Sequence, residues 1–199
     1  MKILLTAFEP FNGEKINAAL ETVNRVCVPD GVTLCTLTVP TVFGLCTDTV
    51  IDKIRSFRPD AVIMTGQASG RSAISLERIA VNLRDARIPD NAQNQPVDVP
   101  VDPDGPAAYF STLPVKAMRE AILAAGVPCE LSCNAGTFVC NDLMYGVLHT
   151  LSLAVFPIPA GFIHLPCTPE QAVLYEKKTP SMKTEDAAKG LKAAISSLL

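Results

Sequence analysis

The sequence predicts an α/β protein, a three-layer α/β/α sandwich with a twisted, mainly parallel sheet. Short apolar runs of strand length alternate with segments whose apolar residues recur every three or four positions, which is typical of repeated strand–helix–strand units. The run AVIM at 61–64 is apolar without alternation, as in a central strand covered on both faces. With 199 residues, 48% of them hydrophobic, the chain is expected to form one domain over 1–199 rather than two small ones.

Strands are expected where apolar runs are bounded by proline, glycine or aspartate. In chain order these runs are KILLTAF at 2–8, VTLCTLTV at 32–39, DAVIMTG at 60–66, CELSC at 129–133 and GFIHL at 161–165. The alternation of Ile79, Val81 and Leu83 indicates a further strand in the stretch SLERIAVNL.

Helices are expected between these strands, where apolar residues form stripes at helical spacing. Thr184 is expected to cap the last helix. Another helix is expected from 141 to about 153, followed by a turn over 156–160. The stripes are Phe43, Cys46, Val50, Ile54 and Phe57 before Pro59; Val115, Met118, Ile122 and Ala125 between Pro114 and Gly126; and Ala188, Leu191, Ile195 and Leu198.

Charge and composition exclude several classes of partner. The formal net charge of −3 leaves no basic surface of the kind on which nucleic-acid binding depends. Residues 143–169 lack Asp, Glu, Lys and Arg, but four prolines in that stretch would break a membrane-spanning helix. The apolar run at the amino terminus is too short for a signal peptide. We therefore expect a cytoplasmic protein with no nucleic-acid or membrane partner.

The seven cysteines show no paired Cys-x-x-Cys spacing, so they are expected to be reduced thiols rather than zinc ligands. A competing interpretation assembles Cys133, Cys140, His164 and Cys167 into a metal site. The sequence favours no metal and no cofactor, because Cys140 is better explained by its place in the chain.

Residues 84–108 break the regular pattern, with five prolines and five aspartates in 25 residues. Loops of this length in compact domains usually serve as lids or binding loops, or are disordered. We expect a partly ordered flap near the active site, with a surface excursion or a subunit contact as the alternative.

Cys140 is the candidate nucleophile. It follows the strand CELSC and the turn at Ala135 and Gly136, where a helix begins, and functional groups of open α/β sheets collect at such junctions. Unpaired N–H groups and the helix dipole stabilise a thiolate, so the pKa of Cys140 is expected to fall below about 8.5. The other cysteines are expected to be inert.

A nucleophilic thiol needs a base, and the chain has two histidines. His149 lies more than two helical turns beyond Cys140, whereas His164 ends a strand and would share the same sheet edge. Glu77 is a candidate for the carboxylate that orients the imidazole. On spacing alone, a merely hydrogen-bonded histidine and a solvated glutamate remain the alternatives.

Six motifs follow one another along the chain: TAFEPF at 6–11, GQASGR at 66–71, ERIAVNLRDARIPDN at 77–91, NQPV at 94–97, AGTFVCN at 135–141 and GFIHLP at 161–166. Together they resemble pyroglutamyl peptidase I, the pyrrolidone-carboxylate peptidase family of cysteine peptidases. The resemblance runs from about residue 2 to residue 171 and weakens beyond it.

This resemblance implies an enzyme that removes an amino-terminal pyroglutamyl residue from peptides through an acyl-enzyme. It implies that Cys140 is the nucleophile, His164 the general base and acid, and Glu77 the orienting carboxylate. Members of the family commonly form tetramers.

The resemblance also implies a pocket for the lactam ring, a flat neutral group suited to aromatic faces and a few directed hydrogen bonds. Ala7 stands where many relatives have glycine and Ala18 where they often have proline, two departures that bear on the fine shape of the pocket. The implied pocket residues are Phe8 and Phe11 around the ring, Phe138 and Val139 beside the nucleophile, Asn17 and Gln67 as polar groups, and Arg87 for oxyanion stabilisation.

Two other functions remain as alternatives. One is a non-catalytic relative that binds lactam-capped peptides, against which the intact Cys140, His164 and Glu77 argue. The other is a thiol amidase that accepts a different small acyl group.

Overall fold

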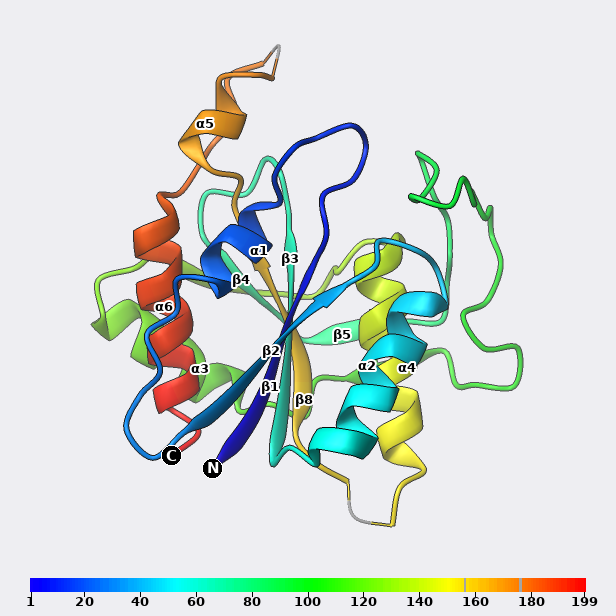
Figure 1. Cartoon of the computed structure of the whole chain (residues 1–199). Helices are drawn as coiled ribbons and strands as arrows, with labels where there is room; N and C mark the ends of the chain where they lie inside the picture. Colours follow the sequence, from blue (N-terminus) through cyan, green and yellow to red (C-terminus); the bar gives the residue numbers. More distant parts are fainter. Residues whose placement is uncertain (156, 176) are drawn as a thin grey trace.

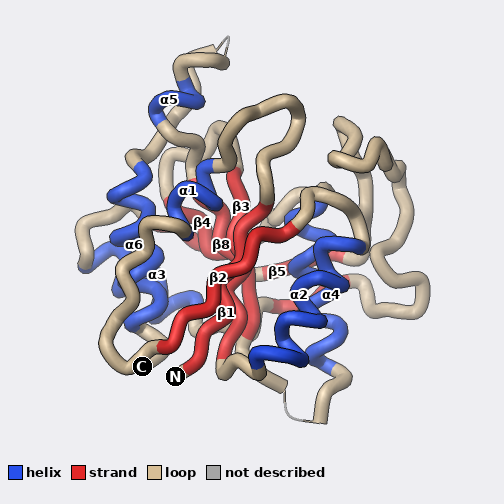
Figure 2. The backbone as a smooth tube through the Cα atoms, viewed as in Figure 1, coloured by secondary structure: helices blue, strands red, loops and turns tan. Residues whose placement is uncertain are grey.

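A six-stranded sheet forms the centre of the computed structural model, which describes residues 1–155, 157–175 and 177–199. The strands lie in the order β2-β1-β3-β8-β4-β7 and twist strongly across the sheet (Figures 1 and 2). Neighbouring strands are parallel except for β4 and β8, which are antiparallel. The predicted mainly parallel sheet is confirmed. The strands are β1 (Lys2–Phe8), β2 (Thr33–Val39), β3 (Ala61–Gln67), β4 (Ile74–Glu77), β7 (Cys129–Ser132) and β8 (Ala160–Leu165).

Helices cover both faces of this sheet, which confirms the three layers (Figures 1 and 2). On one face lie α1 (Ala18–Val23), α3 (Val115–Ala124) and α6 (Thr184–Ser196). On the other lie α2 (Leu45–Phe57) and α4 (Val139–Ser152). The short α5 (Pro169–Ala172) follows β8 and lies beyond the carboxyl ends of the strands.

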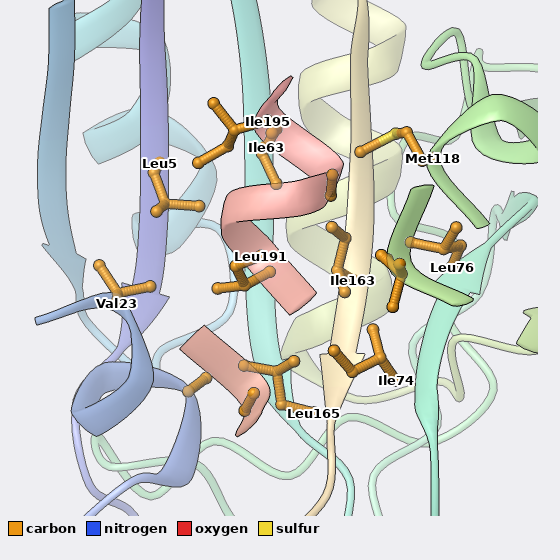
Figure 3. Close-up of a cluster of buried hydrophobic side chains, with 14 of the residues drawn as sticks. Leu5, Val23, Ile63, Ile74, Leu76, Met118, Ile163, Leu165, Leu191 and Ile195 are labelled. Atoms are coloured by element: carbon orange, nitrogen blue, oxygen red, sulfur yellow. The ribbon is translucent and has the colours of Figure 1, made fainter. Parts of the chain in front are cut away.

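Two hydrophobic cores result, because successive side chains of a strand point to opposite faces. In β3, Ile63 packs into the core with α3 and α6, while Val62 and Met64 pack into the core with α2 and α4. Figure 3 shows the first core, in which Leu191 and Ile195 of α6 lie over the strands. Burial on both faces explains why AVIM is apolar throughout.

The stretch around Glu77 differs from the prediction of one strand containing Ile79, Val81 and Leu83. Glu77 ends β4 in the central sheet, whereas β5 (Ile79–Val81) pairs with β6 (Ala108–Phe110) in a separate two-stranded sheet. Leu83 lies outside both strands. The alternation of apolar residues predicted β5, but it did not indicate that the chain leaves the central sheet at Arg78. The strand β6 and the helices α1 and α5 were also not predicted.

The last helix was predicted correctly but its cap was wrong. Lys183 occupies the N-cap position of α6 without a side-chain hydrogen bond, and Thr184 is the first helical residue. The end of α3 follows the prediction, because Gly126 adopts a positive φ of 76° directly after the helix. The predicted turn over 156–160 begins at Phe156, which lies outside the described residues.

The uncharged stretch 143–169 holds most of α4, the β8 strand and the chain between them. Of the helices that the described residues form, none has both the length and the apolarity required to cross a bilayer.

The segment 84–108 is irregular, as predicted, apart from a two-residue bridge and the first residue of β6. Arg84 and Val99 form the antiparallel bridge. The backbone N–H of Asn91 donates to the carbonyl of Thr41 at 3.0 Å, which ties the segment to the chain before α2. The N–H of Asp85 donates to the carbonyl of Thr137 at 3.0 Å, which places the beginning of the segment beside the start of α4.

Candidate active site

A cavity of about 550 Å³ opens where β1, β3 and β8 end and α4 begins. Both Cys140 and His164 line it. The pocket residues expected from the resemblance also line it: Phe8, Phe11, Asn17, Gln67, Arg87, Phe138 and Val139. Glu77 lies behind His164 and is fully buried. The structure therefore gathers the predicted site residues around one cavity.

Cys140 is the second residue of α4, at the strand-to-helix junction that the sequence predicts. The N-cap residue Phe138 has an extended backbone and makes no side-chain capping bond. The first N–H groups of this helix are therefore left without a capping side chain and can meet negative charge that develops in the cavity.

His164 and Glu77 are joined by a buried hydrogen bond, in which His164 Nδ1 donates to Glu77 Oε1 at 2.8 Å. The antiparallel pairing of β4 and β8 creates this contact: Ser75 lies opposite His164 and Glu77 opposite Phe162, so the two side chains are diagonal neighbours on one face. Glu77 is thus not the solvated glutamate of the alternative interpretation. Its bond to Nδ1 leaves Nε2 as the nitrogen available for proton transfer.

Gly66 lies next to both the Cys140 sulfur and the strand position of His164. It pairs in register with His164, and a Cβ atom at position 66 would lie 2.9 Å from Cys140 Sγ. Among the described residues no hydrogen bond joins Sγ to His164, so the thiol and the imidazole are adjacent to the cavity without being paired.

The expected lowering of the Cys140 pKa is wrong for this structure. The residue is partly exposed to the cavity, but removal of its sulfur from water, followed by the negative charge of Glu77, raises the pKa of the thiol to about 12. Burial also lowers the pKa of His164, against the opposing effect of Glu77. At neutral pH the resting pair is therefore a thiol and a neutral imidazole.

Gly66→Ala is expected to lower kcat at least about tenfold and to destabilise the fold by about 1–3 kcal/mol. The added Cβ would lie 2.9 Å from both Cys140 Sγ and the Phe162 ring, which is too close for either to stay in place. Activity and thermal unfolding measure the two effects. Gly161→Ala is the matched control, because its Cβ would meet Ser111 and Leu113 instead. Unchanged turnover in folded Gly66→Ala protein would contradict this account of the site.

Aromatic side chains form part of the cavity wall. Phe138 lies between Phe11 and Phe43, with ring centroids 6.2 Å and 5.3 Å away. Phe43 was predicted only as part of a helical stripe, yet it supports Phe138. Phe8 is 2% exposed and packs against Phe162, so it is largely a core residue that also reaches the cavity.

The two predicted polar groups already have protein partners. Gln67 Oε1 accepts from the backbone N–H of Ala18 at 2.8 Å and from Gln171 Nε2 at 2.8 Å. Asn17 Oδ1 accepts from the N–H of Ala19 and caps α1. The alanine at position 18 has a structural consequence, because a proline there would lack the N–H that holds Gln67.

Arg87 lines the same cavity as Cys140, and its segment is bound to the residues just before α4. The N–H of Asp85 donates to the Thr137 carbonyl at 3.0 Å, and Thr137 Oγ1 donates to the Asp85 carbonyl at 2.7 Å. Arg87 itself is exposed and lines the cavity. The 84–108 segment therefore contributes to the cavity, as a flap near the site would.

Several residues at the site were not predicted. Glu14 and Tyr175 line the cavity, and Tyr175 donates to Glu14 Oε1 at 2.7 Å. Arg71 donates to Glu77 Oε1 at 2.6 Å. Arg71 lies within the GQASGR motif, and this motif could have identified it from the sequence. Tyr175 lies beyond the six motifs.

The competing metal site is not assembled in the described part of the chain, where no three His, Cys, Asp or Glu side chains are grouped as ligands. Cys133 is exposed and Cys167 is buried.

Known proteins resemble this chain over its whole length. The family model described as pyroglutamyl peptidase matches residues 1–199, including the tail in which the quoted motifs weaken. A pyrrolidone-carboxylate peptidase from Levilactobacillus brevis is 51% identical over 200 residues, covering 100% of this chain and 98% of the relative.

Solved structures agree with this match. Pyroglutamyl peptidase I from Bacillus amyloliquefaciens superposes with a TM-score of 0.92 at 42% identity, covering 97% of this chain and 94% of that chain. A mutant pyrrolidone carboxyl peptidase from Pyrococcus furiosus gives a TM-score of 0.94 at 39% identity, covering 100% and 98%. The resemblance inferred from the motifs is confirmed, and the chain belongs to the pyroglutamyl peptidase family.

Proposed function

We propose that residues 1–199 act as one catalytic domain, a cysteine exopeptidase that removes an amino-terminal pyroglutamyl residue from peptides. The observation that carries the site assignment is the buried Glu77–His164 hydrogen bond, whose imidazole lines the same cavity as Cys140. Family membership supports the substrate class.

The first half of the reaction forms a thioester. As Cys140 Sγ attacks the pyroglutamyl carbonyl carbon, its proton passes to His164 Nε2, and the charge of Glu77 stabilises the resulting imidazolium. The carbonyl oxygen becomes an oxyanion near the first N–H groups of α4 and the Arg87 guanidinium. When the C–N bond breaks, His164 returns the proton to the leaving amine.

The second half restores the enzyme. A water molecule gives a proton to His164 as its oxygen attacks the thioester carbon, the C–S bond breaks, and the sulfur recovers its proton. Pyroglutamate leaves as the free acid. Transfer of the thiol proton during the attack is consistent with the raised pKa of Cys140, because a neutral imidazole is then the form that reacts.

The lactam ring is assigned to the cavity wall formed by Phe8, Phe11, Phe138 and Val139. Pyroglutamate carries no charged amino group, and these side chains offer it apolar and aromatic surface. Gln67 and Asn17 border the same cavity. Because their amides are bound by protein groups, we assign them chiefly to fixing the shape of the pocket.

A panel of three anilides tests this function. Purified protein is expected to release the chromophore from pyroglutamyl anilide at least about 10²-fold faster than from prolyl or alanyl anilide. The prolyl ring lacks the lactam carbonyl and bears a charge that the apolar wall disfavours. Preference for another acyl group would favour the thiol amidase, and binding of pyroglutamyl peptide without turnover would favour the non-catalytic relative.

We also propose a cytoplasmic homotetramer. Exposed apolar side chains support an assembly, among them Leu153, Val155, Val173 and Leu174. Small pyroglutamyl peptides are the proposed substrates. A monomeric mass in sedimentation equilibrium would refute the tetramer without bearing on the reaction.

A further inference from the structure

Arg71 connects the carboxylate of Glu77 to the segment that leads to Cys140. It lies in the connection between β3 and β4. Its Nη1 donates to Glu77 Oε1 at 2.6 Å, and its Nη2 donates to the carbonyl of Asn134 at 2.8 Å. His164 Nδ1 binds the same Glu77 oxygen at 2.8 Å. One carboxylate oxygen therefore joins the arginine and the histidine.

Glu77 needs a cationic partner at all stages of the reaction. Its side chain is 0% exposed, and its other oxygen, Oε2, has no hydrogen-bond partner among the described residues. A buried carboxylate is costly to keep charged without a paired cation. His164 is neutral in the resting enzyme and cannot supply that charge, whereas a guanidinium is always charged.

We propose that Arg71 is a positioning residue of this active site: its guanidinium keeps the buried carboxylate of Glu77 charged and in place behind His164, and it fixes the nucleophile segment at Asn134. This inference rests on the roles proposed above for Glu77, His164 and Cys140. Arg71 is not one of the residues that line the cavity, and it acts on the reaction through Glu77.

The charge of Arg71 also acts on the protons of the site. The groups that face Glu77 are His164 on β8, Arg71, the uncharged Ser132 opposite it on β7, and Cys140 at the start of α4. Burial acts to raise the pKa of Glu77, but its bond to His164, the nearby Ser132 hydroxyl and the positive charge of Arg71 lower it overall. The positive charge of Arg71 also lowers the pKa of His164 and opposes the rise in that of Cys140.

The sign of the expected pH effect follows from these contributions. The reaction needs an ionised Glu77 and a neutral His164, so protonation of either group ends activity at low pH. Without the positive charge of Arg71 both groups bind protons more readily, and both pKa values rise. The acid limb of kcat/KM is therefore expected to move to higher pH.

The test compares Arg71→Met, which removes the charge, with Arg71→Lys, which keeps it but cannot reproduce the fork that reaches both Glu77 and Asn134. We expect Arg71→Met to lower kcat about 10²-fold, as misplacement of a catalytic group does. KM for pyroglutamyl anilide should stay within about threefold, and the acid limb should move up. Arg71→Lys should lower kcat while keeping the acid limb near that of the unmodified chain.

Arg84→Met is a matched control outside the catalytic group. Arg84 donates to the buried Asp142 at 2.6 Å, and the exposed fractions of the two side chains, 25% and 0%, match the 24% and 0% of Arg71 and Glu77. Losing this pair should lower thermal stability to a similar degree. The acid limb should not move, because Asp142 is not bonded to His164.

Two results would overturn the inference: folded Arg71→Met with kcat within about threefold of normal and an unmoved acid limb, or an Arg84→Met control whose acid limb moves equally. If Arg71→Met does not fold, Arg71→Lys decides, and full kcat in that variant counts against the role. Cys140→Ala keeps the two proposals separable. An inactive Cys140→Ala beside a normal Arg71→Met removes only this inference, whereas an active Cys140→Ala removes the proposed site itself.

Discussion

Cys140→Ala is expected to lower kcat/KM for pyroglutamyl anilide by on the order of 10⁶-fold, the scale of loss when a catalytic nucleophile is removed. In the proposed mechanism the sulfur forms the acyl-enzyme, and a methyl group cannot replace it. Because the residue is only partly buried at the edge of a cavity, the thermal unfolding temperature should change little. Release of the chromophore measures the loss, and mass spectrometry of quenched reactions should detect the acyl-enzyme only in the unmodified chain.

Cys133→Ala is the control for this prediction. Cys133 is an exposed thiol seven positions earlier in the chain, just after β7, and its removal should leave turnover intact. Near-normal turnover in Cys140→Ala would refute the nucleophile assignment, while equal losses in both variants would indicate a general effect on the fold.

Glu77→Gln is expected to lower kcat by about 10⁴-fold, as when the carboxylate of a catalytic triad becomes an amide. The amide carries no charge, so the imidazolium that forms on His164 loses its stabilisation. An amide NH₂ turned toward Nδ1 would also favour the wrong tautomer. Arg71 would lose its anion in a buried setting, so the unfolding temperature should fall as well. Activity is therefore measured per folded molecule, below the onset of unfolding.

Glu130→Gln separates these effects from the loss of any nearby carboxylate. Glu130 lies on the neighbouring strand β7, is exposed, and accepts from Ser75 Oγ at 2.8 Å. Its replacement should leave kcat almost unchanged. Folded Glu77→Gln protein with more than about a tenth of normal kcat would show that His164 does not depend on this carboxylate.

Much of the fold could be predicted because buried strands and helices place apolar residues at regular spacing in the sequence. The strand at 2–8 and the helix stripe from Met118 to Ile122 follow directly from apolar spacing. Cys140 could be placed because a strand, a small-residue turn and a helix follow one another within a short stretch. These features depend on residues that are close together in the sequence, so the spacing of apolar residues can predict them.

The features that could not be predicted depend on distant parts of the chain. The switch of sheets after Glu77 is decided by pairing of β5 with β6, about 30 residues later in sequence. The raised pKa of Cys140 follows from tertiary burial and from the charge of Glu77, 63 positions away, which outweigh the effect of the helix start. The bond from Arg71 to Asn134 likewise has no signature in local spacing.

The position of β8 has a consequence for biosynthesis. It is the last strand in chain order among the described residues, yet it inserts between β3 and β4 rather than adding at an edge. A growing polypeptide that does not yet contain β8 has a divided sheet, with β2, β1 and β3 on one side and β4 and β7 on the other. In such a chain Glu77 has no contact with His164, which lies on β8. The proposed catalytic group can therefore assemble only after β8 has been inserted into the sheet, so its formation is one of the late steps of folding.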